Sequence, residues 1–325
     1  MWTKLAILVG ALCGGVAPVA ANAQSYNFTY FNVPGAYSTT ATGINDSGEI
    51  VGSFTNDDGV SQGFLYDNGS FTTIDVPGAL DTELFGINDN GEIVGDYYDL
   101  AAHYDGGFLY SDGSFTNLNP GCSNLGCNYQ FNAYGINNSG EIVGNADGDE
   151  GVLDDDGTFS FFIPPGTPSA YPVSAYGINN DGDIVGAGWD GAFLYSDGSF
   201  TDLPVPSSQP SENMGSPSGI NDSGDIVGGF DTGSVIYSDG TSMSFGDAGT
   251  SAFGINDDGD IVGTENSSFA SGCAAVVSEG SEGACSFLAT PAGAAAVPEP
   301  GSLALLAPGV FALLALRRAG GRPII

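Results

Sequence analysis

Carboxylate side chains are the most abundant chemically active groups in this chain, and two short clusters of them could bind a cation. The first cluster holds Asp147, Asp149 and Glu150, and the second holds Asp154 and Asp156. Calcium takes oxygen ligands, so it is the one cofactor that we consider. No segment has EF-hand or RTX spacing, and Asp is also a common turn residue, so we favour a solvated surface over a metal site.

Residues that could support catalysis are few. The chain has one histidine, His103, in an irregular stretch between expected strands, which argues against a Ser-His-Asp site. Paired carboxylates can perform glycoside hydrolysis, but acids are so frequent here that their presence does not discriminate. No phosphate-binding loop is present. We therefore predict no catalytic residue and a protein that is not an enzyme.

The charge of the chain is strongly negative. It has 39 acidic residues and 4 Lys or Arg, and a formal net charge of −35 at pH 7. The four basic residues, Lys4, Arg317, Arg318 and Arg322, all lie near the termini. Binding to nucleic acid and to anionic lipid headgroups depends on basic side chains, so both are excluded for the region between.

One decapeptide recurs six times with a period near forty residues, which indicates a repeat architecture. Each copy has the form Gly-Ile-Asn-x-x-Gly-Glu/Asp-Ile-Val-Gly, and the copies start at Gly43, Gly86, Gly135, Gly177, Gly219 and Gly254. The polar centre predicts a tight turn between two strands, with Gly48 at positive φ in the first copy. A second hairpin follows in most repeats, as in Gly-Phe-Leu-Tyr-Asp-Asn-Gly-Ser-Phe from residue 63. Each repeat therefore supplies four short strands.

Two features predict that these modules form a six-bladed β-propeller. Consecutive apolar pairs such as Ile50-Val51 indicate strands covered on both faces, as in stacked blades. The segment Tyr26–Val33 resembles the fourth strand of a repeat, and the last repeat lacks that strand, so the N-terminal strand is expected to close the ring. An open β-solenoid or a β-sandwich is the alternative.

The six decapeptides, each paired with a Phe-Leu-Tyr-like hairpin, resemble the HAF-repeat family of extracellular repeat proteins over most of residues 26–290. The His-Ala-Phe triplet that names the family is absent: the places read Gln62-Gly63-Phe64, Gly106-Gly107-Phe108 and Gly191-Ala192-Phe193. The resemblance implies an extracellular protein and supplies no defined activity.

The N-terminus is typical of a signal peptide. Lys4 precedes an apolar stretch, and Ala21-Asn22-Ala23 fits the small-x-small cleavage pattern, which predicts a signal peptide over 1–23 and a mature chain from Gln24. A transmembrane anchor is the less favoured alternative. Four cysteines remain after cleavage, and their spacing suggests the pairs Cys122–Cys127 and Cys273–Cys285, although four cysteines allow three connectivities.

The C-terminal tail, after a linker over 291–296, has three parts within residues 297–322. Val297-Pro298-Glu299-Pro300 is followed by an apolar segment to Leu316 and by Arg317-Arg318. This order resembles the PEP-CTERM sorting signal of Gram-negative bacteria, which implies recognition by an exosortase. The apolar segment is slightly short for a permanent span of about 20 residues, which favours transient anchoring by an apolar helix over an uncut membrane anchor.

These observations together predict an all-β propeller over 24–290, preceded by a signal helix and followed by a sorting helix. We expect the protein to be exported to the cell surface or extracellular matrix, after a transient stage at the inner membrane. Signal peptidase and an exosortase are the expected partners during export, and exopolysaccharide is the candidate ligand of a non-enzymatic binding or structural module. The alternatives are a propeller hydrolase or lyase acting on exopolysaccharide, and a calcium-stabilised scaffold.

Overall fold

The structure is a computed structural model. It describes residues 25–99, 104–118, 130–146, 150–168, 171–189, 191–203, 216–230, 233–246, 249–266, 273 and 284–292. The expected signal helix and the C-terminal apolar helix lie outside these residues. No helix among the described residues is long and apolar enough to cross a membrane.

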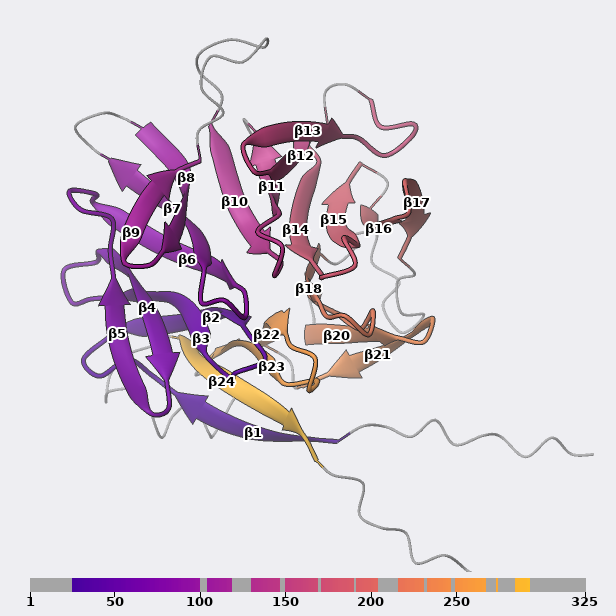
Figure 1. Ribbon diagram of the computed structural model, residues 1–325. Coiled ribbons are helices and arrows are strands. Elements are labelled where there is room, and N and C mark those ends of the chain that lie inside the picture. Colours follow the sequence, from indigo (N-terminus) through magenta and orange to yellow (C-terminus); the bar gives the residue numbers. More distant parts are fainter. Residues whose placement is uncertain are drawn as a thin grey trace, which may run out of the picture. The chain divides into compact units, whose positions relative to one another are not determined.

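The described chain forms six four-stranded antiparallel sheets, arranged in chain order around an axis (Figure 1). The first three blades are each a continuous meander. Blade 1 contains β2 (Ser38–Ile44), β3 (Ile50–Thr55), β4 (Ser61–Asp67) and β5 (Ser70–Ile74). Blade 2 contains β6 (Asp81–Ile87), β7 (Ile93–Asp99), β8 (Tyr104–Ser111) and β9 (Ser114–Asn117). Blade 3 contains β10 (Phe131–Ile136), β11 (Ile142–Ala146), β12 (Glu150–Asp155) and β13 (Thr158–Phe162).

The next two blades repeat this plan, and the sixth combines both ends of the domain. Blade 4 contains β14 (Ser174–Ile178), β15 (Ile184–Gly188), β16 (Gly191–Ser196) and β17 (Ser199–Asp202). Blade 5 contains β18 (Ser216–Ile220), β19 (Ile226–Phe230), β20 (Gly233–Ser238) and β21 (Thr241–Phe245). Blade 6 contains β22 (Thr250–Ile255), β23 (Ile261–Asn266), β24 (Ala284–Pro291) and β1 (Tyr26–Phe31). The prediction of a six-bladed propeller is confirmed.

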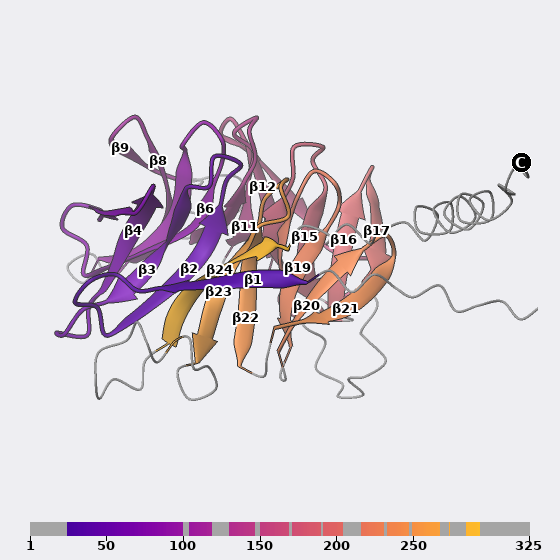
Figure 2. The same cartoon turned by 90° about the horizontal axis from the view of Figure 1, so that it is seen from below.

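The N-terminal strand closes the ring, as predicted. β1 pairs antiparallel with β24 along its whole length, from Tyr26 opposite Pro291 to Phe31 opposite Ser286, and Figure 2 shows the two strands side by side. The side chain of Phe28 packs between Phe245 and Phe287 of the last two blades. Chain ends that pair with each other leave no unpaired strand at the seam, which protects it from other chains.

The Ile-Val pair of each decapeptide fills the spaces on both sides of its blade. Ile50 packs with Phe64 and Val262 toward blade 6, and the next residue, Val51, packs with Leu84 toward blade 2. Successive side chains of a strand point to opposite faces, so a strand enclosed between two blades needs apolar residues at both positions. This packing is the physical reason for the doublet that the sequence repeats.

Glycine sets the spacing at the axis. A Cβ on Gly43 would lie 2.7 Å from the carbonyl oxygen of Phe85 and 3.3 Å from the Cα of Gly86, and the first glycine of each other decapeptide meets the next blade in the same way. Only a residue without a side chain allows the six inner strands to approach so closely.

Candidate functional site

The asparagines of the six decapeptides form a closed ring of hydrogen bonds at one end of the axis. Each Nδ2 donates to the backbone carbonyl of the matching asparagine in the next blade, at 2.9 to 3.1 Å, and each asparagine is almost fully buried. The last of these bonds runs from Asn256 to Asn45 and joins blade 6 to blade 1. In the first turn, Asn45 Oδ1 accepts the N–H groups of Ser47 and Glu49. The consensus asparagine therefore both shapes its own turn and ties neighbouring blades together.

The next position of the decapeptide forms a second ring, which carries charge. Each backbone N–H donates to the side-chain oxygen of the same position in the following blade, at 2.8 to 2.9 Å. In ring order the six residues are Asp222, Asp257, Asp46, Asp89, Asn138 and Asn180. Four acids are thus consecutive, and the two amides cap the ends of the run: Asn138 Nδ2 donates to Asp89, and Asn180 Nδ2 donates to Asp222.

Burial raises the pKa of Asp257 in this ring, and the neighbouring carboxylates of Asp46 and Asp222 raise it further, against a lowering by the N–H of Asp222. The hollow at the centre is only about 70 Å³, well below the 300 to 1,000 Å³ of typical ligand pockets. No group of three or more His, Cys, Asp or Glu residues is placed to hold a metal ion in the part of the chain that the structure describes. We therefore interpret the two rings as structural.

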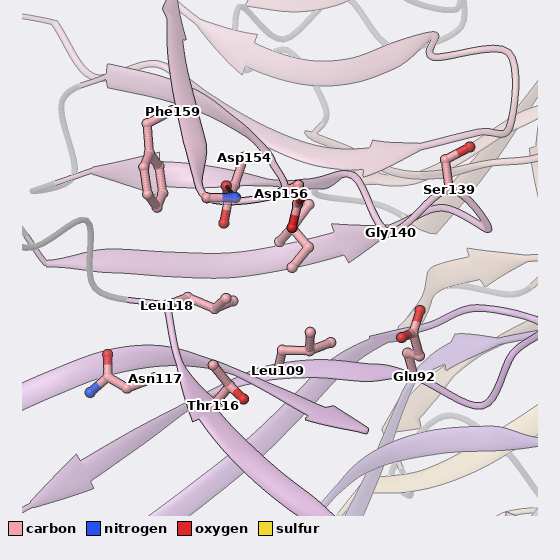
Figure 3. Close-up of a pocket in the computed structure, with 12 residues that line it drawn as sticks. Glu92, Leu109, Thr116, Asn117, Leu118, Ser139, Gly140, Asp154, Asp156 and Phe159 are labelled. Atoms are coloured by element: carbon pink, nitrogen blue, oxygen red, sulfur yellow. Dashed lines mark hydrogen bonds between the residues drawn. The ribbon is translucent and has the colours of Figure 1, made fainter. Parts of the chain in front are cut away.

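A much larger opening, of about 700 Å³, lies between blades 2 and 3 (Figure 3). One wall comes from blade 2, with Leu109 on β8 and Asn117 at the end of β9. The other wall comes from blade 3, with Asp154 on β12 and Phe159 on β13. The remaining lining residues are Glu92, Thr116, Leu118, Ser139, Gly140, Ile142, Asp156 and Gly157. We call this opening the interblade cleft.

The cleft exists because blade 3 lacks an aromatic side chain that four other blades have. At the position that pairs with the first isoleucine of the second strand, those blades carry Tyr66, Tyr110, Tyr195 and Tyr237. In blade 4 the ring of Tyr195 stacks on Phe162 of the preceding blade at a centroid distance of 5.6 Å. Burial at this position raises the pKa of Tyr237 to about 12. The tyrosine thus acts as a wedge between adjacent blades.

Blade 3 has Asp154 at the wedge position, opposite Ile142. Blade 6 also lacks the tyrosine and has Ala289 there, but Tyr26 and Phe28 of β1 pack on Phe245 of blade 5 and fill that space. No described side chain compensates in this way for Asp154. The replacement of a large aromatic ring by a short carboxyl group leaves the space that forms the cleft.

Asp154 is nearly buried, with 5% of its surface exposed, yet its side chain faces the cleft in Figure 3. The N–H of Gly157 donates to Asp154 Oδ1 at 2.9 Å, and it is the one donor to this carboxyl group among the described residues. Burial raises the pKa of Asp154, the N–H of Gly157 lowers it, and the charges of Asp155 and Asp156 raise it. A carboxyl group in this setting is costly to ionise, so its presence at a position that holds tyrosine in four other blades calls for a functional reason.

The acids proposed from the sequence as calcium ligands are only partly brought together. Asp154 and Asp156 both line the interblade cleft, whereas Glu150 lies at the opposite end of β12, paired with Ala146. Asp147 and Asp149 lie outside the described residues. Glu92, Asn117 and the apolar wall of the cleft were not predicted from the sequence. A comparison of the repeats could have identified blade 3, because Val-Leu-Asp-Asp-Asp-Gly from residue 152 stands where blade 4 has Phe-Leu-Tyr-Ser-Asp-Gly.

The other residues singled out from the sequence contribute nothing to the cleft. Cys273 and Cys285 are joined by a disulfide beside Tyr30 in blade 6. Cys122, Cys127 and His103 lie outside the described residues, as do the cleavage residues Ala21, Ala23 and Gln24 and the sorting residues Val297, Pro298, Glu299, Pro300, Arg317 and Arg318.

No family model matches the chain, and no curated protein matches it. Among solved structures, it is similar to virginiamycin B lyase from Staphylococcus aureus, with 14% identity, a TM-score of 0.46, and coverage of 74% of this chain and 82% of the lyase. It is also similar to a gluconolactonase from Xanthomonas campestris, with 11% identity, a TM-score of 0.45, and coverage of 83% and 96%. A structural-genomics target provisionally described as a gluconolactonase shows 12% identity, a TM-score of 0.48, and coverage of 82% and 92%. No function is transferred from likenesses this distant.

Proposed function

We propose that this chain is an exported repeat protein of the cell surface or extracellular matrix, in which the propeller is a non-enzymatic binding module for exopolysaccharide. Signal peptidase and an exosortase process the two ends, and the C-terminal apolar segment anchors the chain transiently in the inner membrane. The observation that carries the binding proposal is the interblade cleft, where Asp154 replaces the tyrosine that closes the equivalent space elsewhere.

The lining of the cleft fits a saccharide. Its volume of about 700 Å³ falls within the usual range for ligand pockets and accommodates more than one sugar ring. Phe159 and Leu118 offer apolar surface to the C–H face of a sugar, while Asn117, Thr116 and the carboxylates offer hydrogen-bonding groups to hydroxyls. Exposed aromatic rings elsewhere on the surface, such as the contacting pair Tyr171 and Trp189, supply further apolar contacts for a polymer.

The negative charge of the domain restricts the class of glycan that it can bind. No Lys or Arg lies between Gln24 and Leu316, so the cleft has no basic side chain of this kind to pair with a uronate or sulfate group. The net charge of the chain repels polyanions at a distance. Neutral and cationic polysaccharides are therefore the expected classes.

A glycan-binding screen with the secreted protein and its Asp154→Tyr variant tests the proposal. The tyrosine restores the consensus wedge and fills the cleft, so we expect the variant to remain folded and to lose binding to the glycans that the native protein captures. Equal binding by both proteins would exclude the cleft as the binding site. Fractionation of the host with and without its exosortase tests the location, and surface display that does not depend on the exosortase would contradict the sorting proposal.

One observation favours a second function, that of a hydrolase or lyase acting on exopolysaccharide. Glycoside hydrolases use two carboxyl groups, one of them with a raised pKa as the general acid. Asp154 has a raised pKa, and the carboxylates of Asp156 and Glu92 line the same cleft. The two functions separate on turnover: an enzyme releases new reducing ends from a bound glycan and loses this activity in Asp154→Asn, whereas a binding module releases none.

A further inference from the structure

The charges of the interblade cleft are not balanced within the protein. Glu92 on the blade 2 side accepts hydrogen bonds from the side chains of Asn88 and Ser111. Asp154 accepts one backbone N–H, and no described residue donates to the side chain of Asp156. Acceptors therefore outnumber donors on the blade 3 side, and a ligand that offers donors or positive charge would satisfy them.

Asp154 is the acid that the cleft encloses most fully. It is more than nine-tenths buried as a residue, it faces the cleft, and one of its oxygens accepts the N–H of Gly157 while the other has no donor among the described residues. That second oxygen is open to the cleft, so a molecule bound there can supply its hydrogen-bond donor. A cation would do so most effectively, because a charge-assisted hydrogen bond is about twice as strong as a neutral one.

We infer that the interblade cleft binds a saccharide that carries a protonated amine, and that Asp154 and Asp156 receive the ammonium group while Phe159 and Leu118 contact the sugar ring. This inference rests on the proposed function, since it names the class of glycan that enters the same cleft. The free amine supplies both the positive charge and the N–H donors that the blade 3 wall lacks. An N-acetylated sugar of the same shape supplies a single neutral donor at that position.

Two oligosaccharides that differ in one group test the inference. The probes are the tetramers of glucosamine and of N-acetylglucosamine, titrated calorimetrically into the full secreted protein at about pH 5, because neighbouring oxygen atoms place the pKa of a sugar amine well below that of a lysine side chain. We expect the free-amine tetramer to bind at least about tenfold more tightly, as one charge-assisted hydrogen bond implies. We expect Asp156→Asn to lose most of this preference.

The homologous turn of blade 4 offers a matched control. Asp156 and Asp197 occupy the same place in their hairpins with φ values of 48° and 50°, and blade 1 has Asn68 there with a φ of 47°. Asp197→Asn thus makes the same change of charge in the same backbone conformation, away from the cleft. We expect it to leave the preference for the free amine unchanged. An equal loss in Asp156→Asn and Asp197→Asn would show diffuse attraction to an acidic surface and would overturn the inference.

The remaining outcomes separate this inference from the proposed function. If both tetramers bind with equal affinity and Asp154→Tyr abolishes both, the cleft is a glycan site and the inferred amine is wrong. If Asp154→Tyr binds both tetramers as the native protein does, the cleft is not the site, and the proposed function fails together with the inference. If the native protein prefers the free-amine tetramer and both Asp154→Tyr and Asp156→Asn remove that preference, the inference is supported.

Discussion

The substitution Asp154→Tyr should stabilise the protein while it closes the interblade cleft. Blade 4 supplies the structural template, because Tyr195 lies at the equivalent position with its ring centroid 4.8 Å from Phe200 and 5.6 Å from Phe162. In the register of blade 3, Phe159 takes the place of Phe200 opposite the substituted residue. Leu118 of blade 2 lines the cleft at the place that corresponds to Phe162 in the contact between blades 3 and 4.

The expected gain follows from three contributions. Burial of an aromatic ring that would otherwise be exposed contributes about 1.5–3 kcal/mol. One aromatic pair with Phe159 contributes about 0.5–1.5 kcal/mol. Removal of a nearly buried carboxyl group adds to the gain, whereas the new hydroxyl group needs a hydrogen-bond partner and subtracts from it. We expect a net increase of about 3 kcal/mol in the free energy of unfolding, or about 6 °C in Tm at roughly 2 °C per kcal/mol for a large domain.

Thermal and urea unfolding followed by circular dichroism provide the measurement, with Tyr195→Asp as the reverse substitution in blade 4. That variant loses both ring contacts and places a carboxyl group between blades, so we expect it to lower the free energy of unfolding by about 3–5 kcal/mol. An unchanged or lowered Tm in Asp154→Tyr would show that the cleft does not accept the consensus ring. Blade 3 would then not have lost stability in exchange for a binding space.

Three further predictions concern the closed ring of six blades and the ring of acidic side chains at one end of its axis. Deletion of residues 26–31 removes the fourth strand of blade 6 and exposes the edge of β24; we expect a lower Tm and self-association in size-exclusion chromatography, and a monomer of native stability would contradict closure by this strand. Gly43→Ala places a methyl group against the backbone of the next blade and should cost about 1–3 kcal/mol in urea unfolding, whereas Gly229→Ala, whose added Cβ meets nothing within 4 Å, should cost far less. The raised pKa of Asp257 means that the folded state binds a proton more readily than the unfolded state. The ionised carboxylate therefore destabilises the folded state at pH values above its folded pKa, and this destabilisation fades as the pH falls through that pKa. Asp257→Asn should therefore unfold at a higher temperature than the native protein at pH 7 and lose this advantage in acid; a variant that is less stable at pH 7 would refute the assignment.

Much of the fold was predictable because its rules are local. The Asn-x-x-Gly turn depends on hydrogen bonds within five residues, as shown by Asn45 and by Gly48 with its φ of 77°. The Ile-Val doublet indicated strands covered on both faces, and the number of decapeptides gave the number of blades. The unpaired strand at the N-terminus also predicted its own partner, because the last repeat lacked one strand.

The interblade cleft was not predictable in the same way. Asp154 and Asp156 looked like one more acidic turn, and the sequence suggested calcium for them as readily as solvent. Their role depends on the side chains that face them from blade 2, and those are decided by the packing of two blades whose facing residues are not neighbours along the chain. The inter-blade role of Asn45 was hidden for the same reason, since its Nδ2 bonds to Asn88 of the next repeat.

The sequence by itself determined the turns, the strands, the number of blades and the sign of the charge, because each depends on residues that are neighbours along the chain or on composition alone. The tertiary structure decided where a wedge is missing. A cavity arises when a side chain from one blade fails to fill the space beside another, and only the packed arrangement shows which replacement is compensated, as at Ala289, and which is left open, as at Asp154.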